Sequence, residues 1–410
     1  MTGPAAPHFR TWQAQRGAWS FPVDRADAAR FHVPGEGWKW DLGSQSYNVH
    51  VGHAHPHVLD ALRRAVERAV LTAGPHADVP ERTALADRLR RLSGMDRVFF
   101  ALGGAEAMEN AVKIAMLVTG RDRVLARRRS YHGATLAMLG VAGDPRRAPF
   151  AAGGGPWIDD PYPPRPPSEG RPSDWVEALE AAVDEAGPDR VAAVVLEGLT
   201  GTNGLQIPPP DFWPAARALA DRHGFLLVAD EVFSGLGRTG RTFGFEHFGG
   251  RPDVIVLGKG LTSGYAPLSA ALVSGPVAAH FDDHVLYCGL THYGSPIGCA
   301  AAAACLDVIE REGLVERAAR LGTDLLGRLA DLARGCPAIR DVRGRGLQIG
   351  IELDGPAAAV GRGLWANGYF VPAKGPMLYV CPPLVIEAEA LAGFVEALAA
   401  VLDAPGGKTP

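Results

Sequence analysis

The sequence predicts an α/β protein with a large domain built on a mostly parallel sheet and a smaller α+β domain. Two observations predict this architecture. From about residue 97 to 260, short apolar runs alternate with amphipathic helical segments, as in a parallel sheet flanked by helices. After about Gly298, two long helices precede alternating strands and a final helix, which indicates a second, smaller unit. We expect an N-terminal arm and part of the small domain in 1–50, the large domain in 51–297 and the rest of the small domain in 298–410.

The composition excludes several classes of protein. The chain has 410 residues, of which 21% are charged, and a formal net charge of −4. Because it has no long basic block, we expect no nucleic-acid partner. The five cysteines lack CxxC spacing, which predicts reduced thiols in a cytoplasmic protein and no metal site. Residues 1–5 do not resemble a signal peptide and no apolar run is long enough to span a membrane, so we expect no membrane association.

The first hundred residues are predicted to hold an arm and two helices. Residues 1 to about 45 are predicted as an irregular arm, whose tryptophans are expected to pack on the body or on a partner subunit. A helix is predicted from His55 to about Gly74, because apolar residues recur there at helical spacing. A second helix with the same spacing continues through Leu92.

The middle of the chain is predicted to form the parallel sheet and its helices. The strand candidates are 97–100, 124–126, 191–196, 225–229 and 253–257. The helix candidates are 106–118, 175–185 and 212–223. The Pro- and Gly-rich stretch from 145 to 173 is interpreted as a surface excursion, because strands continue beyond it.

The C-terminal part is predicted to form the smaller domain. Two helices are expected over 300–312 and 315–334, followed by a stretch, 342–353, that ends in one alternating strand. Another strand over 377–380 and a final helix through Leu402 complete the unit.

Asp230 follows directly after one predicted buried strand, and Lys259 stands two residues after the end of another. Ligands of α/β folds bind at the carboxyl ends of parallel strands, so these two side chains are expected to meet at one edge of the sheet. An amine there can form a Schiff base with a carbonyl cofactor. A carboxylate there can keep a pyridinium nitrogen protonated, as proteins do for pyridoxal phosphate. Taken singly, such an Asp is more often a helix cap and such a Lys a loop residue, so the prediction depends on the surrounding residues.

Three further segments offer the other contacts that this cofactor needs. The segment 103–107 lies between a predicted strand and a helix, where free N–H groups form an anion site suited to a phosphate. The ring of Tyr131 follows another strand candidate and can stack on one face of a planar cofactor, although a buried aromatic at a turn is the alternative. Val232, two residues after Asp230, can cover the other face.

The segment 235–240 matches the pattern G-x-G-x-x-G. In a dinucleotide fold that pattern joins the first strand directly to a helix. Here it lies beyond the turn at Asp230, and a poor helix start follows. We therefore interpret it as a loop and not as a nicotinamide site.

With these residues in place, the chain resembles a class III aminotransferase of the pyridoxal-phosphate fold type I superfamily. The resemblance covers about His53 to Leu384, with the motifs in the expected order. The matching segments are 52–56, 104–113, 131–133, 230–232 with 237–240, 258–261, 289–291, 342–347 and 382–384. It implies an enzyme that moves an amino group between an amine or amino acid donor and a keto acid or aldehyde acceptor, through a pyridoxamine phosphate form of the cofactor.

The resemblance also implies roles for individual residues. Lys259 is the Schiff-base lysine and Asp230 the partner of the cofactor's ring nitrogen. Thr291 is expected to reach the cofactor phosphate of the neighbouring subunit, which implies a homodimer with the active site at the interface. The other residues implied to bind pyridoxal phosphate are Gly104, Ala105, Tyr131, His132, Glu197 and Val232.

Three departures from the family pattern bear on specificity. Ala105 stands where the family usually has Ser or Thr, so a hydroxyl contact to the phosphate is lost while the backbone N–H groups remain. The segment 198–204 replaces the commoner Pro-x-Gln-Gly-Glu-Gly-Gly and is more like the amine- or taurine-type pyruvate transaminases. Tyr379 stands where members that bind an α-carboxylate often carry Arg, so a bidentate clamp is missing there. Lys374 and Arg362 are candidates to replace it.

The substrate side of the site is expected in two places. The segment 41–47 occupies the family's substrate-pocket stretch. The residues expected to set specificity are Ser44, Gln45, Tyr47, Tyr379 and Lys374. Because fold does not determine reaction, a pyridoxal-phosphate enzyme with another outcome (aminomutase, racemase or lyase) stays open, as does the less favoured non-catalytic cofactor-binding protein.

Overall fold

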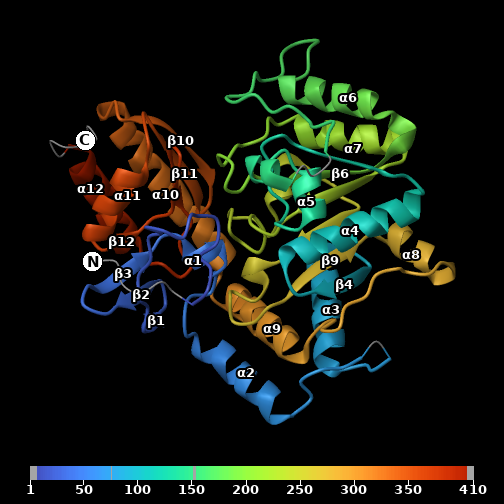
Figure 1. The fold of residues 1–410 in the computed structure, drawn as a ribbon, viewed down its shortest axis with the longest axis horizontal. Helices are drawn as coiled ribbons and strands as arrows, with labels where there is room; N and C mark the ends of the chain where they lie inside the picture. The colour runs from blue at the N-terminus through green and yellow to red at the C-terminus, as the bar shows by residue number, and fades with distance from the viewer. Residues whose placement is uncertain (1–6, 75, 151–153, 404–410) are drawn as a thin grey trace.

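The computed structural model describes residues 7–74, 76–150 and 154–403. Within them, the strands form one six-stranded sheet and two four-stranded sheets. Figure 1 shows the six-stranded sheet in one body, while the smaller sheets lie together with the C-terminal helices in the other. Residues 1–5, which bear on the signal-peptide prediction, lie outside the described residues.

The six-stranded sheet has the order β4-β9-β8-β7-β6-β5. Its strands are β4 (Arg97–Ala101), β5 (Arg123–Ala126), β6 (Val191–Glu197), β7 (Leu226–Asp230), β8 (Val254–Leu257) and β9 (Ser269–Val273). Strands β5 to β8 are parallel, and β9 runs antiparallel to both β8 and β4. The predicted α/β fold with a mostly parallel sheet is confirmed. The sequence analysis missed β9, because its run of five buried residues contains one β-branched residue and no alternation.

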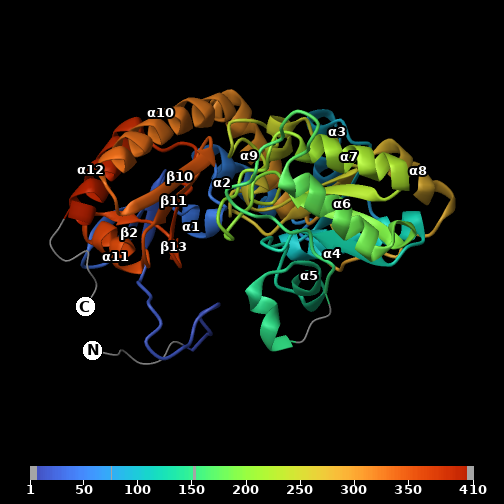
Figure 2. The ribbon, with the colours of Figure 1, turned by 90° about the horizontal axis from the view of Figure 1, so that it is seen from above.

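Helices cover this sheet on both faces: α4 packs on one face, and α3, α6 and α7 pack on the other, with α4 and α3 on opposite sides in Figure 2. Those helices are α3 (Pro80–Ser93), α4 (Gly104–Thr119), α6 (Asp174–Ala186) and α7 (Phe212–His223), with the shorter α5 (Leu136–Val141) and α8 (Gly275–Asp283) nearby. The predicted helices over 106–118, 175–185 and 212–223 are confirmed. Both sheet faces are thus covered, which is why β6 and β8 consist of buried residues throughout.

The smaller body joins the two ends of the described chain. The strands of its first sheet are β1 (Arg25–Asp27), β2 (Arg30–Val33), β3 (Gly37–Asp41) and β12 (Tyr369–Phe370). The prediction of an irregular arm over residues 1 to 45 is therefore wrong for 25–41. This segment is regular because β3 pairs with β12, some 330 positions later in the chain, and a local pattern cannot show such a partner.

The second small sheet has the order β10-β11-β14-β13. Its strands are β10 (Ile339–Arg345), β11 (Gln348–Leu353), β13 (Ala373–Lys374) and β14 (Met377–Val380). The expectation of a single strand at the end of 342–353 is wrong, because Arg345 pairs with Gln348 across a tight hairpin. The helices of this body are α10 (Leu314–Gly335), α11 (Ala358–Ala366) and α12 (Ala388–Asp403).

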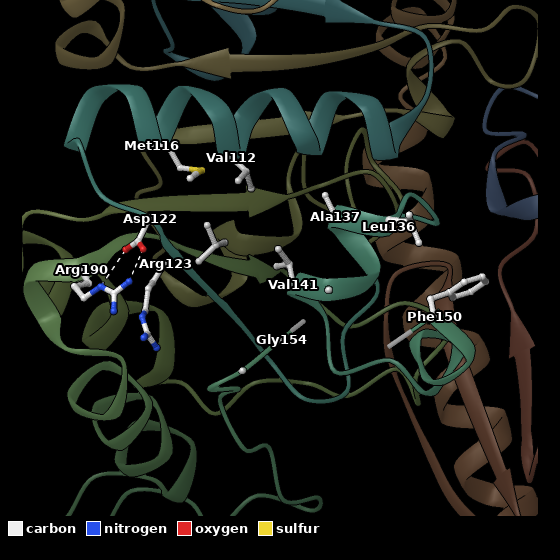
Figure 3. Close-up of a pocket in the computed structure, with 13 residues that line it drawn as sticks. Val112, Met116, Asp122, Arg123, Leu136, Ala137, Val141, Phe150, Gly154 and Arg190 are labelled. Carbon is white, nitrogen blue, oxygen red and sulfur yellow. Dashed lines mark hydrogen bonds and ion pairs between the residues drawn. The ribbon is translucent and has the colours of Figure 1, made fainter. Parts of the chain in front are cut away.

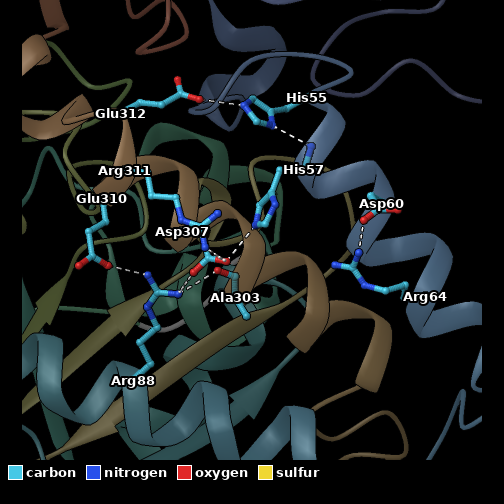
Figure 4. A network of polar contacts seen from close by, with 10 residues as sticks. All are labelled: His55, His57, Asp60, Arg64, Arg88, Ala303, Asp307, Glu310, Arg311 and Glu312. Carbon is cyan, nitrogen blue, oxygen red and sulfur yellow. Dashed lines mark hydrogen bonds and ion pairs between the residues drawn. The ribbon is translucent and has the colours of Figure 1, made fainter.

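Helices α2 (Pro56–Glu67) and α9 (Pro296–Arg311) pack against each other, and Figure 4 shows the polar contacts between them. His57 Nε2 lies 2.9 Å from Asp307 Oδ2, and Arg88 donates to the other oxygen of that carboxylate. His55 Nε2 lies 3.0 Å from Glu312 Oε1. These side chains are partly exposed, so the network adds only modest stability to the helix pair. No described helix combines the length and the apolar character that a membrane crossing requires.

Candidate active site

Strands β6, β7 and β8 end side by side and place three charged residues at one edge of the sheet. Glu197 is the last residue of β6 and pairs in register with Asp230, the last residue of β7. Lys259 opens the 3₁₀ turn η4 (Lys259–Leu261), two residues after β8 ends. All three line a cavity of about 560 Å³, a size within the usual range for small-molecule sites.

Hydrogen bonds hold the Asp230 carboxylate in one orientation. His132 Nδ1 donates to Asp230 Oδ2 at 2.7 Å, and the N–H of Val232 donates to Oδ1 at 3.0 Å. Burial alone lowers the pKa of His132, but the hydrogen bond and the charge of Asp230 outweigh it and leave that pKa raised. The cavity therefore contains a buried carboxylate that can pair with one protonated ring nitrogen.

Lys259 is an amine held in a strained position inside the cavity. Its φ is 39°, in the left-handed region that non-glycine residues seldom adopt except at functional sites. Its Nζ lies 4.6 Å from the ring centroid of Phe233. Burial lowers the pKa of Lys259, although the charges of Asp230 and Glu197 oppose the shift. A larger neutral fraction makes this amine a better nucleophile.

Two buried polar atoms of the cavity-lining residues lack a partner among the described residues. They are His132 Nε2 and Glu197 Oε2. The other Glu197 oxygen accepts the N–H of Gly201 at 2.9 Å, and burial raises the pKa of this carboxyl to about 7. Unpartnered buried polar atoms are uncommon in folded proteins and are expected to meet a polar ligand.

The N-terminus of α4 opens onto the same cavity. Its cap, Gly103, has extended backbone angles and makes no side-chain cap, so the first-turn N–H groups are available to an anion. The turn at Gly133 packs closely against Ala105 in this helix. A Cβ on Gly133, which has a φ of +137°, would lie 2.4 Å from the Cβ of Ala105. A residue larger than Ala at position 105 would therefore crowd the turn at Gly133.

These features fit pyridoxal phosphate, as the sequence analysis expected. Among the predicted cofactor residues, those that line the cavity are Gly104, Ala105, Tyr131, His132, Glu197, Asp230, Val232 and Lys259. Thr291 does not line it and lies exposed in the loop between α8 and α9.

Some of the predicted substrate residues line the cavity and others do not. Gln45 and Tyr47 line the cavity, and both have positive φ angles, of 55° and 63°. Ser44 does not line it, since its buried hydroxyl donates to the carbonyl of Cys381 at 2.6 Å. Tyr379 and Lys374 lie just behind the wall. The Tyr379 hydroxyl donates to the carbonyl of Thr202 at 2.8 Å, and Lys374 Nζ donates to the same oxygen at 3.2 Å.

Several lining residues were not predicted. Phe233 directly follows Val232, so its position in the motif could have pointed to it. Thr202 lies in the segment whose departure from the family pattern was noted. Trp12 and Arg146 come from the arm and from the Pro- and Gly-rich excursion, where no spacing signals a site. Only the packing of distant loops brings these residues together.

The G-x-G-x-x-G segment is a loop, as predicted, between β7 and the turn η3 (Gly244–Phe248). Its buried Arg238 donates to the carbonyls of Leu347 and Pro382, which ties this loop to the smaller body. Glu231 accepts from the N–H groups of Gly244 and Phe245, at 2.7 and 3.0 Å, and so closes the loop. These residues stabilise the position of Asp230 rather than contact the cavity.

A second hollow lies outside α4, where Figure 3 shows the side chains that line it. It is formed by the C-terminal half of α4, by β5 and by the chain around Phe150. Its charged residues are Arg123 and the surface ion pair of Asp122 with Arg190. Its described lining residues do not pair a nucleophile with a base, so they do not form a catalytic site.

Comparison with known proteins agrees with this site. The family model "Aminotransferase class-III" matches residues 15–402. Among curated proteins, an acetylornithine aminotransferase of Mycobacterium tuberculosis is 41% identical, over 88% of this chain and 86% of its own length. One of Methanothermobacter thermautotrophicus is 37% identical, over 88% of this chain and 91% of its own length.

Solved structures with the same fold include two transaminases. A taurine:2-oxoglutarate aminotransferase from Bifidobacterium kashiwanohense, solved with PLP and glutamate, is 29% identical with a TM-score of 0.89, covering 96% of this chain and 94% of its own. An amine transaminase from an uncultivated Pseudomonas species, in a PLP-bound form, is 29% identical with a TM-score of 0.88, covering 97% of each chain.

Proposed function

This chain belongs to the class III aminotransferases, and we propose that Lys259 and Asp230 are the residues at which it performs its pyridoxal-phosphate-dependent transamination. The enzyme moves an amino group between an amine or amino acid donor and a keto acid or aldehyde acceptor. The observation that carries the assignment of residues is the meeting of Lys259, Asp230 and His132 in one cavity, beside the open N-terminus of α4.

Several of the lining residues would hold the cofactor. The first-turn N–H groups at Gly104 and Ala105 receive the phosphate, because a helix N-terminus favours an anion. Tyr131 and Val232 would cover the ring. The Asp230 carboxylate, oriented by His132, would pair with the ring nitrogen. When bound, pyridoxal phosphate withdraws electrons from the substrate carbon that loses its proton.

Lys259 has two tasks in this proposal. Its Nζ would hold the resting cofactor covalently, and the lowered pKa of the amine favours the nucleophilic form that this requires. With an amino donor in the site, the same Nζ would act as the general base, taking the proton from the donor carbon and holding it for return. A general base placed in this way contributes about 10²–10⁴-fold in rate.

The test is the absorbance of the purified holoenzyme before and after addition of a panel of amines and amino acids. We expect a donor to convert the visible band of the resting cofactor to that of its amino form, with one keto or aldehyde product per site. Donors that change the absorbance of the cofactor but release no keto or aldehyde product would overturn the proposal.

We also propose that the enzyme is a homodimer in which Thr291 completes the partner's phosphate site. Thr291 is exposed and stands four residues after Tyr287, which is 69% exposed, and close to the exposed Val285. Apolar side chains grouped on a surface are typical of a protein interface. A Lys259→Ala subunit mixed with a Thr291→Ala subunit should form heterodimers with one intact site and partial activity. Light scattering that shows an active monomer would contradict this.

A cytoplasmic location belongs to the same proposal. It is supported by the five cysteines, all of which are free thiols. Fractionation of cells that express the chain would check it.

A further inference from the structure

Arg146 is the one guanidinium among the described residues that line the cavity. It comes from the 3₁₀ turn η1 (Pro145–Phe150), in the segment that the sequence analysis interpreted as a surface excursion. Its side chain is 22% exposed, so it is neither sealed in the core nor free in solvent. Apart from Arg146, the cationic residue of the lining is Lys259, which the proposed chemistry already uses.

Asp144 orients the guanidinium. Arg146 Nε donates to Asp144 Oδ1 at 2.8 Å, and Nη2 donates to Oδ2 at 2.6 Å. This carboxylate is fully buried, and it also accepts the N–H of Arg146 at 2.8 Å. The two-point pairing uses the Nε edge of the guanidinium. The other edge, formed by Nη1 and Nη2, is left in a fixed plane that matches a second anion.

Two aromatic rings hold the guanidinium at the cavity wall. The guanidinium carbon of Arg146 lies 3.9 Å from the ring centroid of Tyr131 and 4.6 Å from that of Trp12. Both rings line the cavity, and Tyr131 is the residue proposed to cover the cofactor. Cation–π contacts of this kind hold an arginine in place without using its N–H donors.

The segment 198–204, which departs from the family pattern, supports Arg146 by binding Asp144. Asn203 Nδ2 donates to Asp144 Oδ2 at 2.9 Å and to the carbonyl of Ser130 at 2.8 Å. The next residue back, Thr202, accepts the Tyr379 hydroxyl through its carbonyl. The unusual segment 198–204 therefore connects Tyr379, where relatives often carry an arginine, with the residue that orients Arg146.

We infer that Arg146 binds the acid group of the substrate, a carboxylate or a sulfonate, and so replaces the arginine that is absent at position 379. The inference rests on the proposed site around Lys259. Of the two substitutes considered from the sequence, Lys374 lies behind the wall and donates to Asn203 Oδ1 at 3.0 Å, and Arg362 lies exposed on α11. Neither lines the cavity.

The test compares Arg146→Gln with wild-type holoenzyme on substrates that differ in the acid group. The donors are L-alanine, β-alanine, taurine and 1-propylamine, and the acceptors are pyruvate and propanal. Arg147→Gln is the matched control, because the Arg147 guanidinium lies 4.6 Å from the Trp157 ring centroid and does not line the cavity. Thermal melting and the cofactor absorbance establish that each variant folds and holds its cofactor.

We expect Arg146→Gln to lower kcat/KM by roughly a hundredfold for the acids that wild type uses, because a charge-assisted, two-point contact is lost. Turnover of 1-propylamine and propanal should fall far less than turnover of the acids, and Arg147→Gln should leave every substrate unchanged. Arg146→Lys, which keeps the charge but not the fork, should lie between the two. A loss confined to β-alanine and L-alanine identifies the bound group as a carboxylate. A loss confined to taurine identifies it as a sulfonate.

A binding measurement covers the case in which wild type uses no uncharged substrate. Propanoate, an acid without an amine, should inhibit wild type competitively, and its inhibition constant should weaken in Arg146→Gln as kcat/KM does. Equal losses for acids and uncharged substrates, or unchanged use of acids and unchanged inhibition, would overturn the role of Arg146. Failure of wild type with the whole donor panel would instead count against the proposed function.

Discussion

Two walls of the same cavity are built in different ways. The strand-end edge (Glu197, Asp230 and Lys259) stands on adjacent parallel strands, whose register brings these side chains together. The outer wall (Trp12, Arg146 and Thr202) comes from three separate loops that hydrogen bonds and ring contacts hold in place. In the proposed function, the edge bears the groups of the transamination itself, and the outer wall is assigned to the part of the substrate that differs. The comparison therefore separates the residues of the reaction from those of its selectivity.

The largest effect is expected at the edge. Lys259→Ala removes both the covalent anchor and the proposed general base, so turnover should fall by at least about 10⁴-fold for every substrate alike. Single-turnover kinetics and the absorbance of the resting cofactor measure this. Normal transamination by this variant would show that Lys259 is not the catalytic lysine. It would also contradict the assignment of the strand-end edge to the reaction.

Asp230→Asn should lower kcat by about 10²–10⁴-fold, again without changing the order of preferred substrates. The neutral amide no longer holds the ring nitrogen protonated. It also removes the charge that raises the pKa of His132, so burial should bring that pKa down. The histidine titration followed by NMR, together with kcat for an acidic and an uncharged donor, gives the check. A change in substrate ranking would show that the edge also selects.

Glu197→Gln should change how the stability of the folded apoenzyme depends on pH, which tests the burial of the strand-end edge. Burial raises the folded-state pKa of Glu197 from 4.5 to about 7, so the folded apoenzyme binds this proton more tightly than the unfolded chain does. The resulting stability is complete below about pH 4.5 and is lost as the pH rises through about 7. Glutamine has no such dependence, so from pH 5 to pH 8 the variant should gain roughly 2–3 kcal/mol relative to wild type. Denaturant unfolding at both pH values measures it, and a constant difference would contradict the shifted pKa.

The smallest effect is expected behind the outer wall. Tyr379→Phe deletes the hydrogen bond to the Thr202 carbonyl, which is worth about 1 kcal/mol. The change should appear as a few-fold loss in kcat/KM for acidic substrates, with kcat for uncharged ones retained. Wild-type values for both groups would mean that the segment 198–204 is positioned without Tyr379.

The sequence was sufficient for most of the edge but for little of the wall. Asp230 and Lys259 could be predicted because an apolar strand followed by a polar residue is a local pattern, and parallel strands end at a common edge. Tyr131 and Val232 were predicted from their positions after strands, and the resemblance to a family added His132 and Glu197. The expected substrate residue Ser44 was placed by its position in a motif, and the fold turned its hydroxyl toward the Cys381 carbonyl.

The sequence by itself determined the fold class, the run of strands and helices, the family and the two residues at the strand ends, because each depends on neighbours in the chain. Tertiary structure alone decided that residues 25–41 form strands whose last member pairs with β12, that β9 lies antiparallel between β8 and β4, and that Arg146 lines the cavity. These features depend on contacts between segments tens to hundreds of residues apart. Such contacts leave no periodicity in the chain, since the residues that meet are brought together only by the packing of the whole fold.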